Sequence, residues 1–314
     1  MKIVLLIVAA VAVLVLGNLL VPVPRAAIEV AAEPIGLGPV TNAMLTSFVL
    51  SAVILAVAFV VGRTLKLRPG GLQNVVEALI EGLGNLVNQT ATRTWAPRFF
   101  PICCTIFIFL LISNWFGILG PGLGSVGIIH ASDHGTLDAE DITFLRGSAE
   151  QVLADHAAKY GADAHHGVDE AKFVVVPLLR APSSDLNLTL ALALITMFLV
   201  QVFGFWSRGI GYVGQFLRFK SLKTKGFGMG LVDVFVGLFE GLSEFAKVIS
   251  FSFRLFGNIF AGEVILIVIS SLVSLVLVVV FFGLEMFVGL IQAFVFFILS
   301  LAFFHLATEH HDDH

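Results

Sequence analysis

The sequence predicts an all-α integral membrane protein with about five to six membrane helices, and this prediction follows from its composition and hydropathy. Of its 314 residues, 58% are hydrophobic and only 13% are charged, and the mean hydropathy is +0.99. These values are typical of a chain that is embedded in a membrane rather than of a soluble protein with a large core. The small, dispersed net charge of −4 argues against nucleic-acid binding.

Apolar stretches long enough to cross a bilayer, which takes about 20 residues, occur four times before residue 230. They lie at 3–21, 43–62, 102–120 and 186–206. The first follows Lys2 and fits either a cleaved signal segment or a retained first helix. We therefore separate an N-terminal segment with its external part, 1–41, from a membrane domain, 42–314.

The C-terminal third is apolar almost throughout from residue 231 onwards. At a rise of 1.5 Å per residue, 231–270 would form a helix of about 60 Å, whereas the hydrocarbon core is about 30 Å thick. The sequence therefore predicts a long, tilted helix that pairs with a second one at 276–307, as a helical hairpin.

Basic residues set the expected orientation, because cytoplasmic loops are rich in Lys and Arg. One group lies between the second and third apolar stretches and another follows the fourth, so both loops are expected in the cytoplasm, together with the C-terminus. The segment 123–181 is acidic, carries five histidines and is expected outside as an insertion. The histidine spacing fits a solvated loop better than a metal or partner contact.

The first cytoplasmic loop contains apolar residues at helical spacing, such as Val75, Val76, Leu79 and Leu83. This pattern predicts an amphipathic helix lying on the membrane surface. A coiled-coil contact with a soluble partner is the alternative.

A stripe of polar residues runs along one face of the predicted helix at 231–270. Arg254 in this stripe stays charged, and placing its guanidinium at mid-bilayer costs about 3 kcal/mol. No acidic residue lies three or four positions away from it. Glu263 and Glu285 lie in the same apolar stretch, and Glu285 shares a helix face with Gln292. Such groups favour a proton or cation path over a catalytic site. The stripe consists of Glu240, Ser243, Glu244, Lys247, Ser250, Arg254 and Asn258.

The segment "FRLFGNIFAGEVI" (253–265) resembles the signature of subunit a of the F-type ATP synthase, the stator of its proton-driven rotor. Four further segments resemble the same family in the same order, so that the resemblance covers 42–122 and 182–311. They are "LISNWFGILGPG" (111–122), "PSSDLNLTLALAL" (182–194), "FEGLSEFAKVISFSFR" (239–254) and "LIQAFVFFILSLAFFHLATEHH" (290–311).

The resemblance implies a role in ion translocation for nine residues. Arg254 would face the carboxylates of the rotating c-ring, surrounded by Asn258 and Gln292. Glu263 and Glu285 would belong to the half-channel open to the outside. Glu240, Ser243 and Ser250 would belong to the half-channel open to the cytoplasm. Asn114 also aligns with the family, whereas Gly117 stands where some members have Asp.

The resemblance also implies the setting of the protein. We expect a multi-pass subunit of the bacterial inner membrane that contacts the c-ring, the b subunits and lipid, and that binds no cofactor, metal, nucleotide or nucleic acid. Proton flow through it would drive ATP synthesis elsewhere in the complex. Two alternatives are a secondary transporter, which usually shows paired repeats, and a structural anchor, in which Arg254 would have an acidic partner inside the chain.

Overall fold

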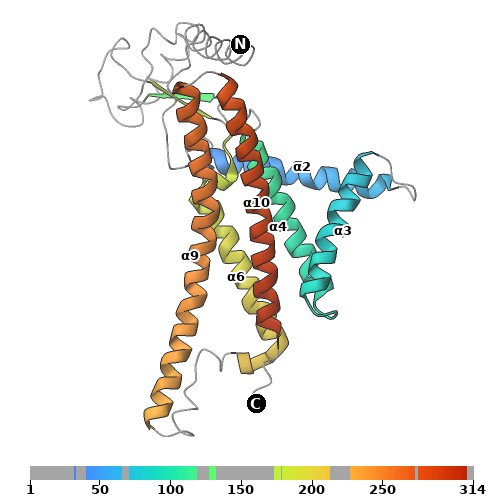
Figure 1. The fold of residues 1–314 in the computed structure, drawn as a ribbon, viewed down its shortest axis with the longest axis vertical. Helices are drawn as coiled ribbons and strands as arrows, with labels where there is room; N and C mark the ends of the chain where they lie inside the picture. Colours follow the sequence, from blue (N-terminus) through green and yellow to red (C-terminus); the bar gives the residue numbers. More distant parts are fainter. Residues whose placement is uncertain are drawn as a thin grey trace, which may run out of the picture. The chain divides into compact units, whose positions relative to one another are not determined.

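The computed structural model describes the chain in segments (Figure 1). The predicted apolar stretch at 3–21 and most of the insertion lie outside the described residues, which are 32, 40–65, 71–118, 127–131, 173–177, 179–212, 227–272 and 275–309.

The chain divides into two compact units, each assembled from three separate segments. Unit 1 comprises Met1–Phe48, Ser113–Asp185 and Ile259–Gly289, and unit 2 comprises Val49–Ile112, Leu186–Asn258 and Leu290–His314.

Within the described residues, five helices are long and apolar enough to span a membrane. The prediction of an all-α, multi-pass membrane protein is confirmed by them, including the unusually long last pair. The 46 residues of α9 correspond to about 69 Å, more than twice the hydrocarbon thickness. The five are α2 (Asn42–Thr64), α4 (Ala96–Ile118), α6 (Leu186–Arg208), α9 (Phe227–Leu272) and α10 (Leu275–Thr308).

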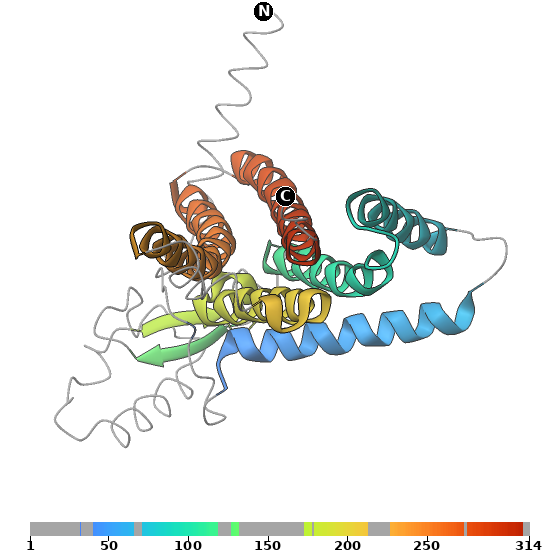
Figure 2. The same ribbon diagram turned by 90° about the horizontal axis from the view of Figure 1, so that it is seen from below.

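The insertion contributes a short two-stranded sheet that was not expected from the sequence. Strands β1 (Gly127–Ala131) and β2 (Phe173–Pro177) pair antiparallel, with Ile129 opposite Val175 (Figure 2). The β-branched residues of both strands favour this conformation.

Helix α3 (Leu72–Thr90) is the predicted amphipathic helix. Towards its C-terminal end Leu83 and Val87 are buried in the core of unit 2, whereas Val75 remains 70% exposed. Exposed apolar side chains on an amphipathic helix are suited to the membrane interface.

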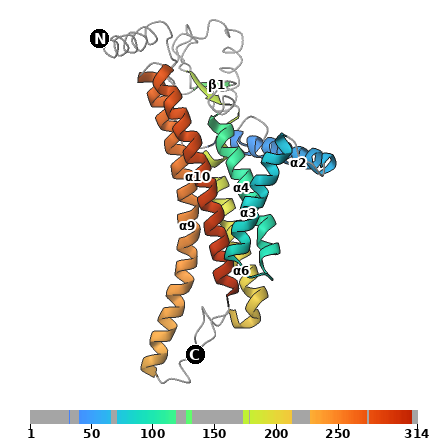
Figure 3. The ribbon, with the colours of Figure 1, turned by 45° about the vertical axis from the view of Figure 1, so that its right-hand side comes forward.

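The core of unit 2 is built from aromatic side chains of α4, α6 and α10, which run beside one another there (Figure 3). The Phe99 ring centroid lies 5.0 Å from that of Phe203 and 5.4 Å from that of Phe304. The rings of Phe203 and Phe304 are 5.1 Å apart. Such close aromatic contacts hold these helices in a fixed register.

Helices α9 and α10 pair antiparallel in unit 2, where Phe251 packs against Phe296 at 4.7 Å and Phe303 at 5.4 Å. On the same side of α9, the Ser252 hydroxyl lies 3.3 Å from that of Thr189 on α6. Hydroxyl contacts between apolar helices fix their mutual rotation. The face of α9 that carries Phe251 and Ser252 is therefore turned inward, and the opposite face is left exposed.

Candidate functional site

Arg254 lies on the exposed face of α9, while its neighbours Phe251 and Leu255 are buried. No ion pair or hydrogen bond joins it to any other residue that the structure describes. A permanent charge in a lipid-compatible helix needs a compensating group. Within the described part of the chain, that group is missing.

Asn258 lies one turn beyond Arg254 on α9, and Gln292 lies on α10. The Asn258 Nδ2 donates to Gln292 Oε1 at 3.1 Å, and Gln292 is 4% exposed whereas Asn258 is exposed. The structure thus brings together the two polar residues that the resemblance placed near Arg254. Their hydrogen bond ties α10 to the Arg254 face of α9.

The N-terminal half of the polar stripe contains a paired charge in unit 2. Lys247 forms an ion pair with Glu244, and its Nζ lies 5.0 Å from the ring centre of Phe303. From α6, Gln201 Nε2 donates to Glu244 Oε2 at 3.2 Å. Glu244 and Lys247 belong to the stripe that the sequence predicts, whereas Gln201 on α6 was not expected, because no local pattern marks it.

The three residues assigned to the cytoplasmic half-channel also lie on this part of α9. Ser243 and Ser250 are exposed and Glu240 is half-buried. The Ser243 hydroxyl donates to the Glu240 carbonyl at 2.8 Å. Nearby, burial raises the pKa of Tyr212 to about 12, with a further contribution from the Glu244 charge, so the Tyr212 hydroxyl stays protonated at neutral pH.

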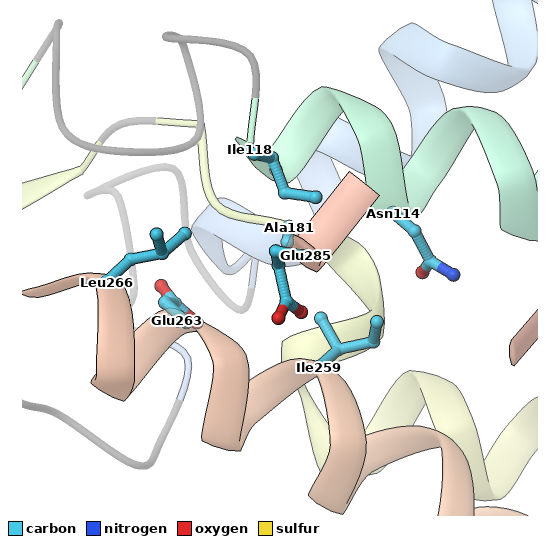
Figure 4. Close-up of a pocket in the computed structure, with 8 residues that line it drawn as sticks. Asn114, Ile118, Ala181, Ile259, Glu263, Leu266 and Glu285 are labelled. Carbon is cyan, nitrogen blue, oxygen red and sulfur yellow. The ribbon is translucent and has the colours of Figure 1, made fainter. Parts of the chain in front are cut away.

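Unit 1 contains a small cavity that brings together the other acidic residues (Figure 4). Its lining comes from α4, from the segment before α6, from α9 and from α10. Polar side chains face an otherwise apolar wall there. The lining residues are Asn114, Gly117, Ile118, Ala181, Ile259, Glu263, Leu266 and Glu285.

Glu285 is 8% exposed and packs directly against the backbone of α9. A Cβ atom at Gly262 would overlap the Glu285 carboxylate, so the glycine makes room for this side chain. Glu285 forms no hydrogen bond or ion pair with any described residue. A buried carboxylate in this situation is stabilised by a proton or by water.

Glu263, in contrast, has a cationic neighbour that was not expected from the sequence. The guanidinium Nη2 of Arg180 lies 3.6 Å from Glu263 Oε2, and the two side chains are 6% and 16% exposed. Arg180 Nε also donates to Ser184 Oγ at 3.0 Å. The available signal was an arginine two positions before the "PSSD" motif, but its partner lies on a helix far along the chain.

Asn114 connects α4 to α10 and to the segment before α6 at the edge of the cavity. Its Nδ2 donates to the Gly289 carbonyl of α10 at 3.0 Å, and its Oδ1 accepts from Ser183 Oγ at 2.6 Å. The next residue, Trp115, donates from Nε1 to the Met286 carbonyl at 3.0 Å. Asn114 therefore lines the cavity and also joins the segments that form its walls.

Gly117 is required by the close approach of the segment before α6. A Cβ atom there would overlap the Ala181 methyl group and lie 3.3 Å from the Ala181 Cα. We expect Gly117→Ala to destabilise the subunit by about 1–3 kcal/mol, as overpacking does. Thermal stability of the purified complex measures this. Adding Ala181→Gly should recover most of the loss; an unchanged Gly117→Ala subunit would contradict the close packing.

With this geometry established, comparison with known proteins shows that the family model described as ATP synthase A chain matches residues 44–305. The chain belongs to the ATP synthase A chain family. It is similar to ATP synthase subunit a of Mycobacterium ulcerans (strain Agy99) and of Mycobacterium marinum (strain ATCC BAA-535 / M). Each is 29% identical over 279 residues, covering 87% of this chain and 89% of the relative.

Membership of the ATP synthase A chain family fits the helical membrane architecture and the absence of a catalytic role for the chain on its own. It makes the chain a multi-pass membrane subunit of the proton-translocating ATP synthase. The match covers α2 through α10, and so includes both the Arg254 face and the cavity of unit 1.

Proposed function

We propose that this chain is the proton-conducting stator subunit in which Arg254 faces the carboxylates of a rotating c-ring. The observation that supports this most directly is the exposed Arg254, which has no ion-pair partner among the described residues. A structural anchor would need an acidic partner for Arg254 inside the chain. A ring of carboxylates brought past α9 supplies the missing countercharge from outside.

The chemistry of the two groups explains the coupling. A rotor carboxylate that crosses lipid must be protonated, and a fixed cation beside it favours its ionised form. Each carboxylate that reaches Arg254 therefore releases its proton. Arginine keeps its charge throughout, whereas a lysine ammonium is able to lose its proton in such a place.

Two half-channels would connect Arg254 to the two sides of the membrane. The cavity of unit 1, with Glu263, Glu285 and Asn114, would form part of the path from the outside. Glu240, Ser243 and Ser250 would line the path to the cytoplasm. In this arrangement the protein lies in the bacterial inner membrane with its C-terminus in the cytoplasm, next to the b subunits.

The exposed face of α9 is shaped for close contact with another helical surface. Around Arg254 in unit 2, exposed positions at helical spacing carry small residues: Ser243, Ala246, Ser250 and Gly257. Small residues allow helices in a membrane to approach closely. This face therefore suits a partner whose own charged group must come within reach of Arg254.

Disulfide cross-linking to the c subunit tests the proposed function. In a background with Cys103 and Cys104 replaced by alanine, cysteine at Ala246 or Ser250 should cross-link to a cysteine placed near the c-subunit carboxylate. Cysteine at the buried Leu255 of the same helix is the matched control and should not react. Cross-linking from Leu255, or from neither face, would contradict the proposed orientation.

A further inference from the structure

The cavity of unit 1 is lined by two glutamates that differ in their surroundings. Glu263 lies 3.6 Å from the Arg180 guanidinium, whereas Glu285 forms no ion pair or hydrogen bond with a described residue. The side chain of Arg180 is only 6% exposed. A buried arginine is costly unless its charge is balanced, so its position next to Glu263 indicates a specific role.

The charged and titratable groups of unit 1 are few. Among its described residues, Arg180 is the single permanent cation, and the titratable groups are Asp185, Glu263, Glu285 and His130. Asp185 lies in the same buried segment as Arg180, and His130 lies in β1. No other titratable side chain occurs in the parts of α2, α4, α9 and α10 that the structure describes in this unit.

Arg180 is itself held in place by its neighbours. Its Nε donates to Ser184 Oγ at 3.0 Å, and the Ser184 hydroxyl donates in turn to the Ala181 carbonyl at 2.9 Å. The neighbouring Ser183 donates a hydrogen bond from its hydroxyl to Asn114 Oδ1. Hydrogen bonds within the described segment before α6 thus hold the guanidinium next to Glu263.

From these contacts we propose that Arg180 is a positioning residue of the external half-channel. Its guanidinium pairs with the Glu263 carboxylate and holds that carboxylate in place at the wall of the cavity. Glu285 lines the same cavity but has no such partner among the described residues. The ion pair therefore fixes the position of one of the two acids that a proton meets in the cavity. This inference rests on the proposed function and adds a residue to it.

The rate of passive proton conduction tests the role of Arg180. Proteoliposomes containing the whole membrane sector are driven by a potassium diffusion potential at equal pH on both sides. Without the guanidinium, the Glu263 carboxylate is no longer held at the cavity wall and is less often in position to pass a proton on.

Arg180→Gln should therefore lower the conduction rate by about tenfold to a hundredfold at an unchanged amount of assembled subunit, the scale of loss expected when a reacting group is misplaced. Arg180→Lys keeps the charge next to Glu263 and should conduct at close to the wild-type rate. Arg63→Gln removes an exposed arginine outside unit 1 and is the matched control, with no expected loss. An unchanged rate in Arg180→Gln, or a lysine variant that loses as much as the glutamine variant, would overturn the proposal.

Loss of assembly in Arg180→Gln is also informative, because it leaves Glu263 buried without a partner. The double variant Arg180→Gln with Glu263→Gln removes both charges of the ion pair and should then assemble again. Failure of both to assemble would show that Arg180 acts on something other than Glu263. A wild-type membrane sector that conducts no protons would instead refute the proposed function itself.

Discussion

Replacing Arg254 by alanine should reduce proton-driven ATP synthesis to about 1% of wild type or less, the scale expected when a preorganised charge is removed from a reacting site. The subunit should still insert and assemble, because the substitution removes a costly charge rather than adding one. ATP synthesis in inverted vesicles measures the loss, and the amount of chain in the purified complex measures assembly. Passive proton conduction should persist or rise, since the cation separating the two half-channels is gone.

Arg254→Lys separates the stator mechanism from a structural role. Lysine keeps a positive charge but can lose its proton when buried, so coupled synthesis should also fail in this variant. A structural anchor predicts the reverse, with near-normal function for lysine and impaired assembly for alanine. Arg98→Ala, which removes an exposed arginine packed against Trp95 and Trp206, should leave coupling intact. An active, coupled Arg254→Ala complex would exclude the proposed mechanism.

Replacing Glu285 by leucine should lower passive proton conduction by about a hundredfold, the lower end of the range for loss of a positioned acid–base group. Glu285→His should retain more conduction, because imidazole also exchanges protons near neutral pH. Conduction by stripped membrane vesicles distinguishes the two variants. Unchanged conduction in Glu285→Leu would identify Glu285 as a structural acid.

The position of Glu285 can be tested without changing its chemistry. Gly262→Ala places a methyl group where the Glu285 carboxylate lies, and the flexible end of this side chain is able to move aside. Conduction should fall while assembly is maintained. Gly283→Ala is the matched control in unit 1, because a Cβ atom there meets no other atom within 4 Å.

The sequence by itself determined the membrane architecture of the described chain. Hydropathy depends on consecutive residues, so the apolar stretches predicted α2, α4 and α6 within a few residues, and the long α9 and α10 were expected from the unbroken C-terminal third. Arg254 stood out for the same reason, since an ionised group in an apolar run is visible without any knowledge of contacts. The strands β1 and β2 were missed because five-residue segments leave only a weak local pattern.

Only the tertiary structure decided which polar groups meet. By their spacing, the seven residues of the stripe share one face of α9. Packing against α6 and α10 gives them different exposures, because the pair of Glu244 and Lys247 is half-buried whereas Arg254 is exposed. Glu263 and Glu285 were assigned by resemblance to the same half-channel, and only the structure shows that Arg180 lies next to Glu263. Helical periodicity fixes the direction of a side chain relative to its own helix, whereas its partners come from segments far along the chain, and only their packing brings these together.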